Sequence, residues 1–162
     1  MNVSLRDVQQ SDLATFYEHQ LDPEATRMAA FRSRDRDAFT AHWAKIMTST
    51  SGTIQTVVFD GSVVGNIGCW EDSGEKLVGY WIGREYWGKG IATAALSEFL
   101  KRVPNRPLVA RVAKHNVASI RVLEKCGFTL VAEDEFAEPD GTHVVESVLM
   151  LHALPPLSQE NV

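Results

Sequence analysis

The stretch Tyr86-Trp87-Gly88-Lys89-Gly90-Ile91-Ala92-Thr93 lies where a predicted strand passes into a predicted amphipathic helix. Its two glycines let the backbone approach a ligand closely. The first amides of the helix that follows lack intrahelical partners, and they carry the positive end of the helix dipole. The stretch therefore predicts a cradle for an anion with several oxygens, such as a diphosphate. These eight residues alone leave open a second interpretation, a tight turn that merely precedes a helix.

The glycine loop matches neither of the two standard phosphate-binding patterns. It lacks the four-residue spacer and the Lys-Ser/Thr ending of a P-loop. Thr93 stands where the dinucleotide pattern has its third glycine, and the preceding strand belongs to an antiparallel meander rather than to a βαβ unit. A generic nucleotide-binding domain is therefore the weaker interpretation.

Outward from this loop, hydrophobic periodicity predicts a mixed sheet covered by helices. Strands are expected at Val3 to Asp7, Ile54 to Phe59, Val63 to Trp70, Lys76 to Ile82, Leu108 to Ala113, Thr129 to Phe136 and Val144 to Leu151. Helices are expected after Ser11 or Asp12 as N-cap, over Arg36 to Thr48, from the glycine loop to Pro104, and from Asn116 to Cys126. The segment from Asp22 to Asp35 is poorly periodic and mixed in charge. It is the candidate for a mobile lip, and whether it closes over a substrate stays open.

Composition limits the classes of function that need to be considered. The chain has 162 residues, with 16 Lys and Arg against 21 Asp and Glu, and a formal net charge of −5. Without basic blocks, binding to a nucleic-acid backbone is not expected. No apolar run is long enough for a membrane span, and the start turns polar too early for a secretory leader, so a cytoplasmic location is expected. Cys69 and Cys126 show neither a disulfide framework nor metal-ligand spacing, so no metal is expected.

A second motif lies downstream, in Asn116-Val117-Ala118-Ser119-Ile120-Arg121-Val122-Leu123-Glu124-Lys125-Cys126-Gly127-Phe128. As structure alone, Asn116 is a helix N-cap, Ser119 lies in the first turn, and Gly127 ends the helix with Phe128 as its hydrophobic follower. In that arrangement Ser119 could also face a cleft.

The two motifs together, Trp87-Gly88-Lys89-Gly90-Ile91-Ala92 and Asn116-x-x-Ser119-x-x-x-Leu123-Glu124-Lys125-x-Gly127-Phe128, resemble the GNAT superfamily of acyl-CoA-dependent N-acetyltransferases. The resemblance implies an α/β (α+β) GNAT fold, with a mixed, mostly antiparallel sheet of six to seven strands and about four helices. It implies one domain over residues 1–152, followed by a polar, flexible tail over 153–162. The chain looks most similar to the ribosomal-protein-alanine N-acetyltransferase (RimJ/RimL-like) branch.

The resemblance also implies which residues bind acetyl-CoA. The loop residues Gly88, Lys89, Gly90, Ile91, Ala92 and Thr93 would wrap the pyrophosphate, next to Trp87. The backbone of Trp81 and Ile82 would pair with the pantetheine arm, and unpaired amides there could polarise the thioester carbonyl. Asn116 would bond the cofactor arm, and Ser119 would lie near the sulfur as the candidate catalytic residue.

Three positions depart from the family pattern. Trp87 stands where many members have Arg or Gln, which removes a charged phosphate contact. Leu123 stands where many have the Tyr that protonates the leaving thiolate, so Ser119 is the substitute candidate. Ala94 replaces a Glu that is frequent in the RimJ/RimL-like branch, which leaves the acceptor open.

The resemblance implies direct attack of an amine on the acetyl carbonyl in a ternary complex, with no protein nucleophile. The acceptor is a peptide N-terminus or a small-molecule amine. The side chains considered as general base are Glu71, Glu133, Glu135, His115 and Glu146. Cys126 is expected to be a packed thiol. The alternative function is a non-catalytic acyl-CoA-binding module, and the oligomeric state is open, with a homodimer among the alternatives.

Overall fold

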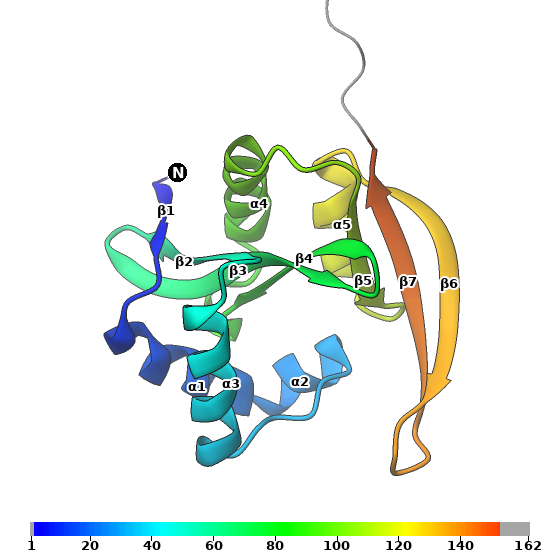
Figure 1. The fold of residues 1–162 in the computed structure, drawn as a ribbon, viewed down its shortest axis with the longest axis horizontal. Helices are drawn as coiled ribbons and strands as arrows, with labels where there is room; N and C mark the ends of the chain where they lie inside the picture. Colours follow the sequence, from blue (N-terminus) through cyan, green and yellow to red (C-terminus); the bar gives the residue numbers. More distant parts are fainter. Residues whose placement is uncertain (1, 153–162) are drawn as a thin grey trace, which may run out of the picture.

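The computed structural model describes residues 2–152, which form one seven-stranded sheet in the order β1-β2-β3-β4-β5-β7-β6 (Figure 1). All neighbouring strands are antiparallel except β4 and β5, which are parallel. This confirms the predicted mixed, mostly antiparallel sheet. The strands are β1 (Val3–Asp7), β2 (Thr53–Phe59), β3 (Ser62–Asp72), β4 (Glu75–Ile82), β5 (Leu108–Ala113), β6 (Thr129–Ala137) and β7 (His143–Leu151).

Helices cover both faces of the sheet. On one face lie α4 (Ile91–Arg102) and α5 (Val117–Lys125), and on the other lie α1 (Leu13–Leu21), α2 (Pro23–Ala29) and α3 (Arg36–Thr48) (Figure 1). Two short 3₁₀ turns, η1 (Gln10–Asp12) and η2 (Arg84–Tyr86), complete the set. The described residues thus hold five α-helices, one more than the sequence suggested.

The main core lies between the sheet and α4. Ile91, Ala95, Leu96 and Phe99 are almost completely buried there, as the apolar stripe of this helix predicts. A second cluster, made of Phe16, Phe39 and Trp43, packs α1 and α3 together on the opposite side. The sheet is therefore clamped between two apolar layers.

Helix α2 lies inside the segment from Asp22 to Asp35, where no helix was expected from the sequence. The Asp22 carboxylate accepts the amides of Glu24 and Ala25, and Pro23 occupies the first helical position. A capping aspartate followed by proline is a strong local start signal, and it outweighed the missing periodicity. The helix ends at Ala30, whose φ of 49° is left-handed.

Asp12 stands at the N-cap position of α1, but its carboxylate does not cap that helix. It accepts two hydrogen bonds from Arg6, at 2.7 and 2.9 Å, and one from the Thr56 hydroxyl at 2.7 Å. The Gln9 amide donates to the same carboxylate at 2.9 Å. This buried group therefore joins β1, η1 and β2. The hydrogen bonds from Arg6 are the main reason that its pKa is lowered to about 2.

The predicted tail, residues 153–162, lies outside the described residues. Of the helices in residues 2–152, none has the length and apolar character that a membrane span requires.

We predict that Asp12→Asn lowers the free energy of unfolding at pH 7 by about 2 kcal/mol, because a carboxyl whose folded pKa is depressed favours the folded state in its ionised form. That contribution is complete above about pH 4 and is lost as pH falls through about 2. Urea unfolding of both proteins at pH 7 and at pH 3 measures it. If the difference in free energy of unfolding between the two proteins were larger at pH 3 than at pH 7, this role of the Asp12 carboxylate would be contradicted.

Candidate functional site

The site begins where β4 and β5 separate. These parallel strands share a single bridge, between Leu77 and Val109, and diverge beyond it. Strands paired along their length saturate each other's peptide groups, whereas diverging strands leave them available. The centre of the sheet therefore opens into a gap without losing its flanking pairs.

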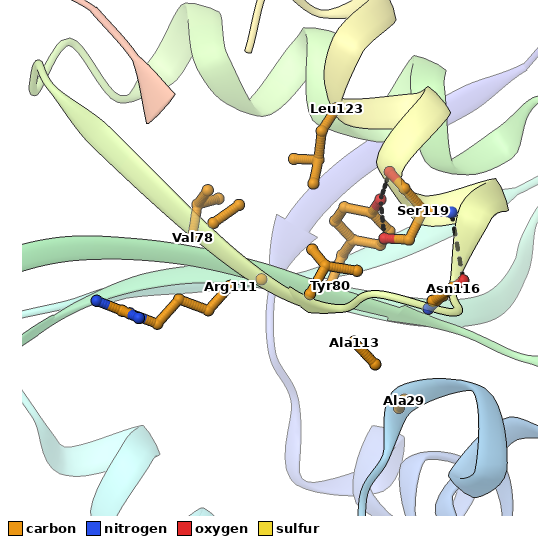
Figure 2. A pocket seen from close by; sticks show the side chains of 11 residues that line it. Ala29, Val78, Tyr80, Arg111, Ala113, Asn116, Ser119 and Leu123 are labelled. Carbon is orange, nitrogen blue, oxygen red and sulfur yellow. Dashed lines mark hydrogen bonds between the residues drawn. The ribbon is translucent and has the colours of Figure 1, made fainter. Parts of the chain in front are cut away.

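A cavity occupies this gap, and side chains from both faces of the sheet line it (Figure 2). Ser119 and Leu123 reach it from α5, while Ala29 of α2 lies on the opposite side of the strands. The remaining lining residues come from β4, β5 and the loop after β5: Val78, Gly79, Tyr80, Ala110, Arg111, Val112, Ala113 and Asn116. Two molecules could thus meet in the gap from opposite faces of the sheet.

Ile82 is the last residue of β4, two positions beyond Tyr80, which lines the cavity. The Gly83 amide donates to the Val64 carbonyl on β3 at 2.9 Å, so alternation along the strand turns the peptide groups of Trp81 toward β3 and those of Ile82 toward β5. The Ile82 carbonyl accepts the Trp87 indole Nε1–H at 2.8 Å. The Ile82 amide N–H points to the same side, toward β5, which is bridged to β4 only between Leu77 and Val109.

The glycine loop adopts the geometry that the sequence suggested. Gly88 and Gly90 have φ of 75° and 78°, in the left-handed region, and Gly90 is the N-cap of α4. No protein acceptor is recorded in the described chain for the amides from Gly88 to Thr93, and Lys89 is exposed beside them. A Cβ on Gly88 would meet nothing within 4 Å. The loop is an open cradle of donors at a helix N-terminus.

Asn116 and Ser119 lie on the α5 side of the gap, as their motif predicted. The Asn116 side chain accepts the Ser119 amide at 3.3 Å and caps the helix. The Ser119 hydroxyl lies 2.8 Å from the Tyr80 hydroxyl (Figure 2). Leu123 is 1% exposed and gives the cavity apolar surface only.

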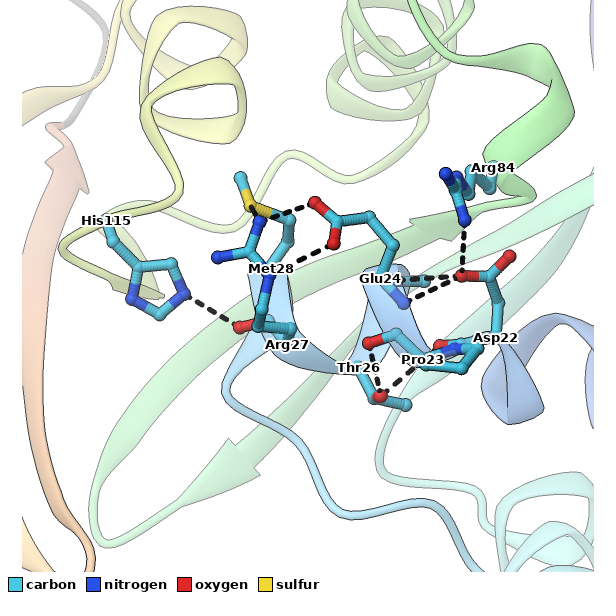
Figure 3. A network of polar contacts seen from close by, with 9 residues as sticks. Asp22, Pro23, Glu24, Thr26, Arg27, Met28, Arg84 and His115 are labelled. Carbon is cyan, nitrogen blue, oxygen red and sulfur yellow. Dashed lines mark hydrogen bonds and ion pairs between the residues drawn. The ribbon is translucent and has the colours of Figure 1, made fainter.

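Helix α2 is held across the other face of the gap by contacts at both ends (Figure 3). Arg84 pairs with Asp22 at 3.4 Å, and the His115 Nε2 lies 2.8 Å from the Arg27 carbonyl. Farther along, the Phe31 ring packs edge-on against Trp81, with centroids 5.4 Å apart. In this structure the segment after α1 therefore rests against the gap.

The four acidic side chains considered as a general base all have a cationic or imidazole partner. Glu71 pairs with Lys76, Glu133 with Lys114, Glu135 with His143, and Glu146 with Arg111. His115, the fifth, contacts the backbone of α2. None of the five is among the residues that line the cavity.

Cys126 packs against the main core, and burial raises the pKa of its thiol. A thiol held protonated in this way is a poor nucleophile, in agreement with the expected structural role. Among residues 2–152 no group of three or more His, Cys, Asp and Glu side chains is arranged to hold a metal ion.

Sequence reasoning missed Tyr80 as a site residue. It was assigned only to a strand, although Val78, Tyr80 and Ile82 alternate onto the face that α4 and α5 cover. That alternation places Tyr80 toward α5, but its proximity to Ser119, 39 positions later, depends on how the helix docks on the sheet.

Comparison with known proteins agrees with this geometry. The family model described as an acetyltransferase (GNAT) domain matches residues 2–129. No curated protein matches the chain in sequence. Solved structures that are 16% to 24% identical to the chain share its fold.

An acetyltransferase of the GNAT family from Bacillus anthracis is 18% identical, with a TM-score of 0.79, over 94% of this chain and 95% of that one. Mycobacterium smegmatis RimJ in complex with CoA-disulfide is 24% identical, with a TM-score of 0.75, over 95% and 84%. Spermidine N-acetyltransferase from Vibrio cholerae in complex with CoA and spermine is 16% identical, with a TM-score of 0.75, over 92% and 95%.

Proposed function

The chain belongs to the GNAT acetyltransferase family and is an acetyl-CoA-dependent N-acetyltransferase, and on that premise we propose how its residues carry out the transfer. The acetyl group passes directly from acetyl-CoA to a primary amine, without an intermediate on the protein. The observation that carries this proposal is the row of amides from Gly88 to Thr93 without a recorded protein acceptor, at the start of the helix that follows β4, the strand whose residues line the gap with Ser119.

The glycine loop is the proposed site of the CoA pyrophosphate. Its successive amides can serve several phosphate oxygens, and the dipole of α4 favours the negative charge. Lys89 adds one positive charge, while Trp87 braces the end of β4 rather than contributing a charge. Binding thus depends on backbone donors more than on arginine or lysine side chains.

The pantetheine arm would follow the gap between β4 and β5, with the thioester between Ile82 and Ser119. The Ile82 amide is the donor that would polarise the thioester carbonyl in the transition state. The Asn116 side-chain NH₂ would bond the arm, since its oxygen caps α5. The Ser119 hydroxyl would donate a hydrogen bond to the departing sulfur.

The amine would approach from the α2 face, opposite to the cofactor. A second pocket, beside α1 and η2, is lined by the exposed carboxylates of Glu18 and Glu85 and by Asp22 in its ion pair with Arg84, an acidic environment that suits a cationic acceptor. A peptide N-terminus is the acceptor that the similarity to RimJ supports, and a polyamine is the one that the similarity to the spermidine enzyme supports. We also propose a cytoplasmic location, where free cysteines stay reduced.

The decisive experiment follows thiol release from acetyl-CoA with a panel of amines, namely peptides with free N-termini, aminoglycosides, polyamines and amino acids. We expect a product heavier by one acetyl group, identified by mass spectrometry, in at least one class. Calorimetry with desulfo-CoA and ATP shows whether the site selects CoA. Tight binding of acetyl-CoA with no product from any amine would indicate an acyl-CoA-binding module instead.

We predict that Gly88→Ala weakens acetyl-CoA binding at least about tenfold, or about 1.4 kcal/mol, because the left-handed backbone of the cradle becomes strained and a methyl group enters it. Gly61→Ala is the matched control. Gly61 has a similar φ of 83° and equally open surroundings, but it lies in the turn between β2 and β3. Isothermal titration of both variants measures the difference, and equal loss of affinity would place the cofactor elsewhere.

We predict that Ser119→Ala lowers kcat about tenfold and leaves the Kd for acetyl-CoA within about twofold, because its hydroxyl acts on the sulfur as the C–S bond breaks. Steady-state kinetics at saturating amine, together with titration of acetyl-CoA, separates the two quantities. Unchanged turnover would remove Ser119 from the mechanism.

A further inference from the structure

Tyr80 and Ser119 supply the only hydroxyl groups among the residues that line the cavity between β4 and β5. Tyr80 projects from β4 toward α5, and its oxygen lies 2.8 Å from the Ser119 Oγ and 3.3 Å from the Ser119 carbonyl (Figure 2). Leu123, one turn farther along α5, lines the same space with a hydrocarbon side chain. The two hydroxyls therefore form a hydrogen-bonded pair in a cavity whose other polar side chains are Arg111 and Asn116.

A serine in the first turn of a helix commonly bonds back to a backbone carbonyl of its own chain segment. Among the described residues, Tyr80 is the only recorded partner of the Ser119 hydroxyl oxygen, and it comes from a different element. The rotamer of Ser119 is thus held from the sheet rather than by the helix. When the phenol donates to Oγ, the serine hydrogen is free to point at another acceptor in the cavity.

We propose that Tyr80 is a positioning residue, which fixes the Ser119 hydroxyl so that its hydrogen points at the sulfur of bound acetyl-CoA. The proposal rests on the function proposed above. In the step concerned, the C–N bond forms and the C–S bond breaks with its electron pair going to sulfur. The attacking amine loses one proton to water, and the thiolate takes one from water. Ser119 donates a hydrogen bond to the developing thiolate, and Tyr80 acts only through Ser119.

The acidity of the phenol supports an indirect role. Burial raises the pKa of Tyr80 to about 12, so this side chain stays neutral and keeps its hydrogen over the working range of pH. A free thiol has a pKa of about 8.5, so Tyr80 is the weaker acid and proton transfer from it to the thiolate is unfavourable. A fixed hydrogen-bond donor is therefore the role that its chemistry allows.

A double-mutant cycle over Tyr80→Phe, Ser119→Ala and the double variant tests the proposal. We expect Tyr80→Phe to lower kcat about fivefold to tenfold and to leave the Kd for acetyl-CoA within about twofold. The double variant should match Ser119→Ala in kcat, because removing the phenol matters only while Ser119 is present. The pH profile of Tyr80→Phe should keep the shape of the wild-type profile, since Tyr80 does not titrate there.

Tyr17→Phe is the matched control, since it also removes a hydroxyl from a half-buried tyrosine. Tyr17 lies on α1 and packs on Phe39 of α3, away from the cavity. The kcat of Tyr17→Phe should equal that of the wild type. Urea unfolding of all variants checks that Tyr80→Phe remains folded. Titration with acetyl-CoA checks that its cofactor site is intact.

Two results would overturn the positioning role in an active wild-type enzyme. One is a kcat of Tyr80→Phe equal to that of the wild type. The other is a double variant whose loss of kcat is the full product of the two single losses. If the wild-type protein itself transfers no acetyl group to any amine, the proposed function fails and this inference fails with it. The two failures are therefore distinguished by the activity of the wild-type chain.

Discussion

The structure depends on one interrupted pairing, the single bridge between Leu77 and Val109 that joins the two halves of the sheet. A continuous sheet would satisfy the peptide groups of β4 and β5 with each other and leave no room at its centre. Divergence beyond this bridge exposes donors on β4 and opens a passage between the two faces. The fold must therefore hold the strands together elsewhere.

That support comes from both sides of the gap. On one side, α4 and α5 pack their apolar residues against the sheet, and the Phe99 and Leu123 side chains are almost fully buried. On the other, Arg111 of β5 contacts Glu75 on β4, Asp134 on the edge strand β6 and Glu146 on β7. These carboxylates raise the pKa of Arg111 and keep it charged. One guanidinium thus ties β5 to three other strands, one of which is β4, the strand from which β5 parts.

The sequence was informative where a signal is local. The glycine loop, the cap at Asn116 and the bounds of Arg36 to Thr48 depend on neighbours within a few positions, and the structure has them as predicted. It failed where distant partners compete. Ser11 or Asp12 was expected to cap the first helix; Asp12 is at the N-cap position, but Arg6 and Thr56 bind its carboxylate instead. The overlooked start of α2 is different, because Asp22-Pro23 was a local signal that periodicity alone ignored.

The catalytic arrangement that we propose follows from what the gap lacks. Leu123 offers no acidic group near the sulfur, and the free thiol of CoA, with a pKa of about 8.5, needs only modest help to leave as a thiolate. Under those conditions orientation matters more than acid strength, since an aligned donor lowers the barrier only if it is already in place when charge develops. A hydroxyl on the first turn of α5, fixed by a phenol from β4, meets that requirement. Ser119 comes from α5 and Tyr80 from β4, the strand that diverges from β5. The packing of α5 on the sheet beside the gap therefore also sets how the two hydroxyls are aligned.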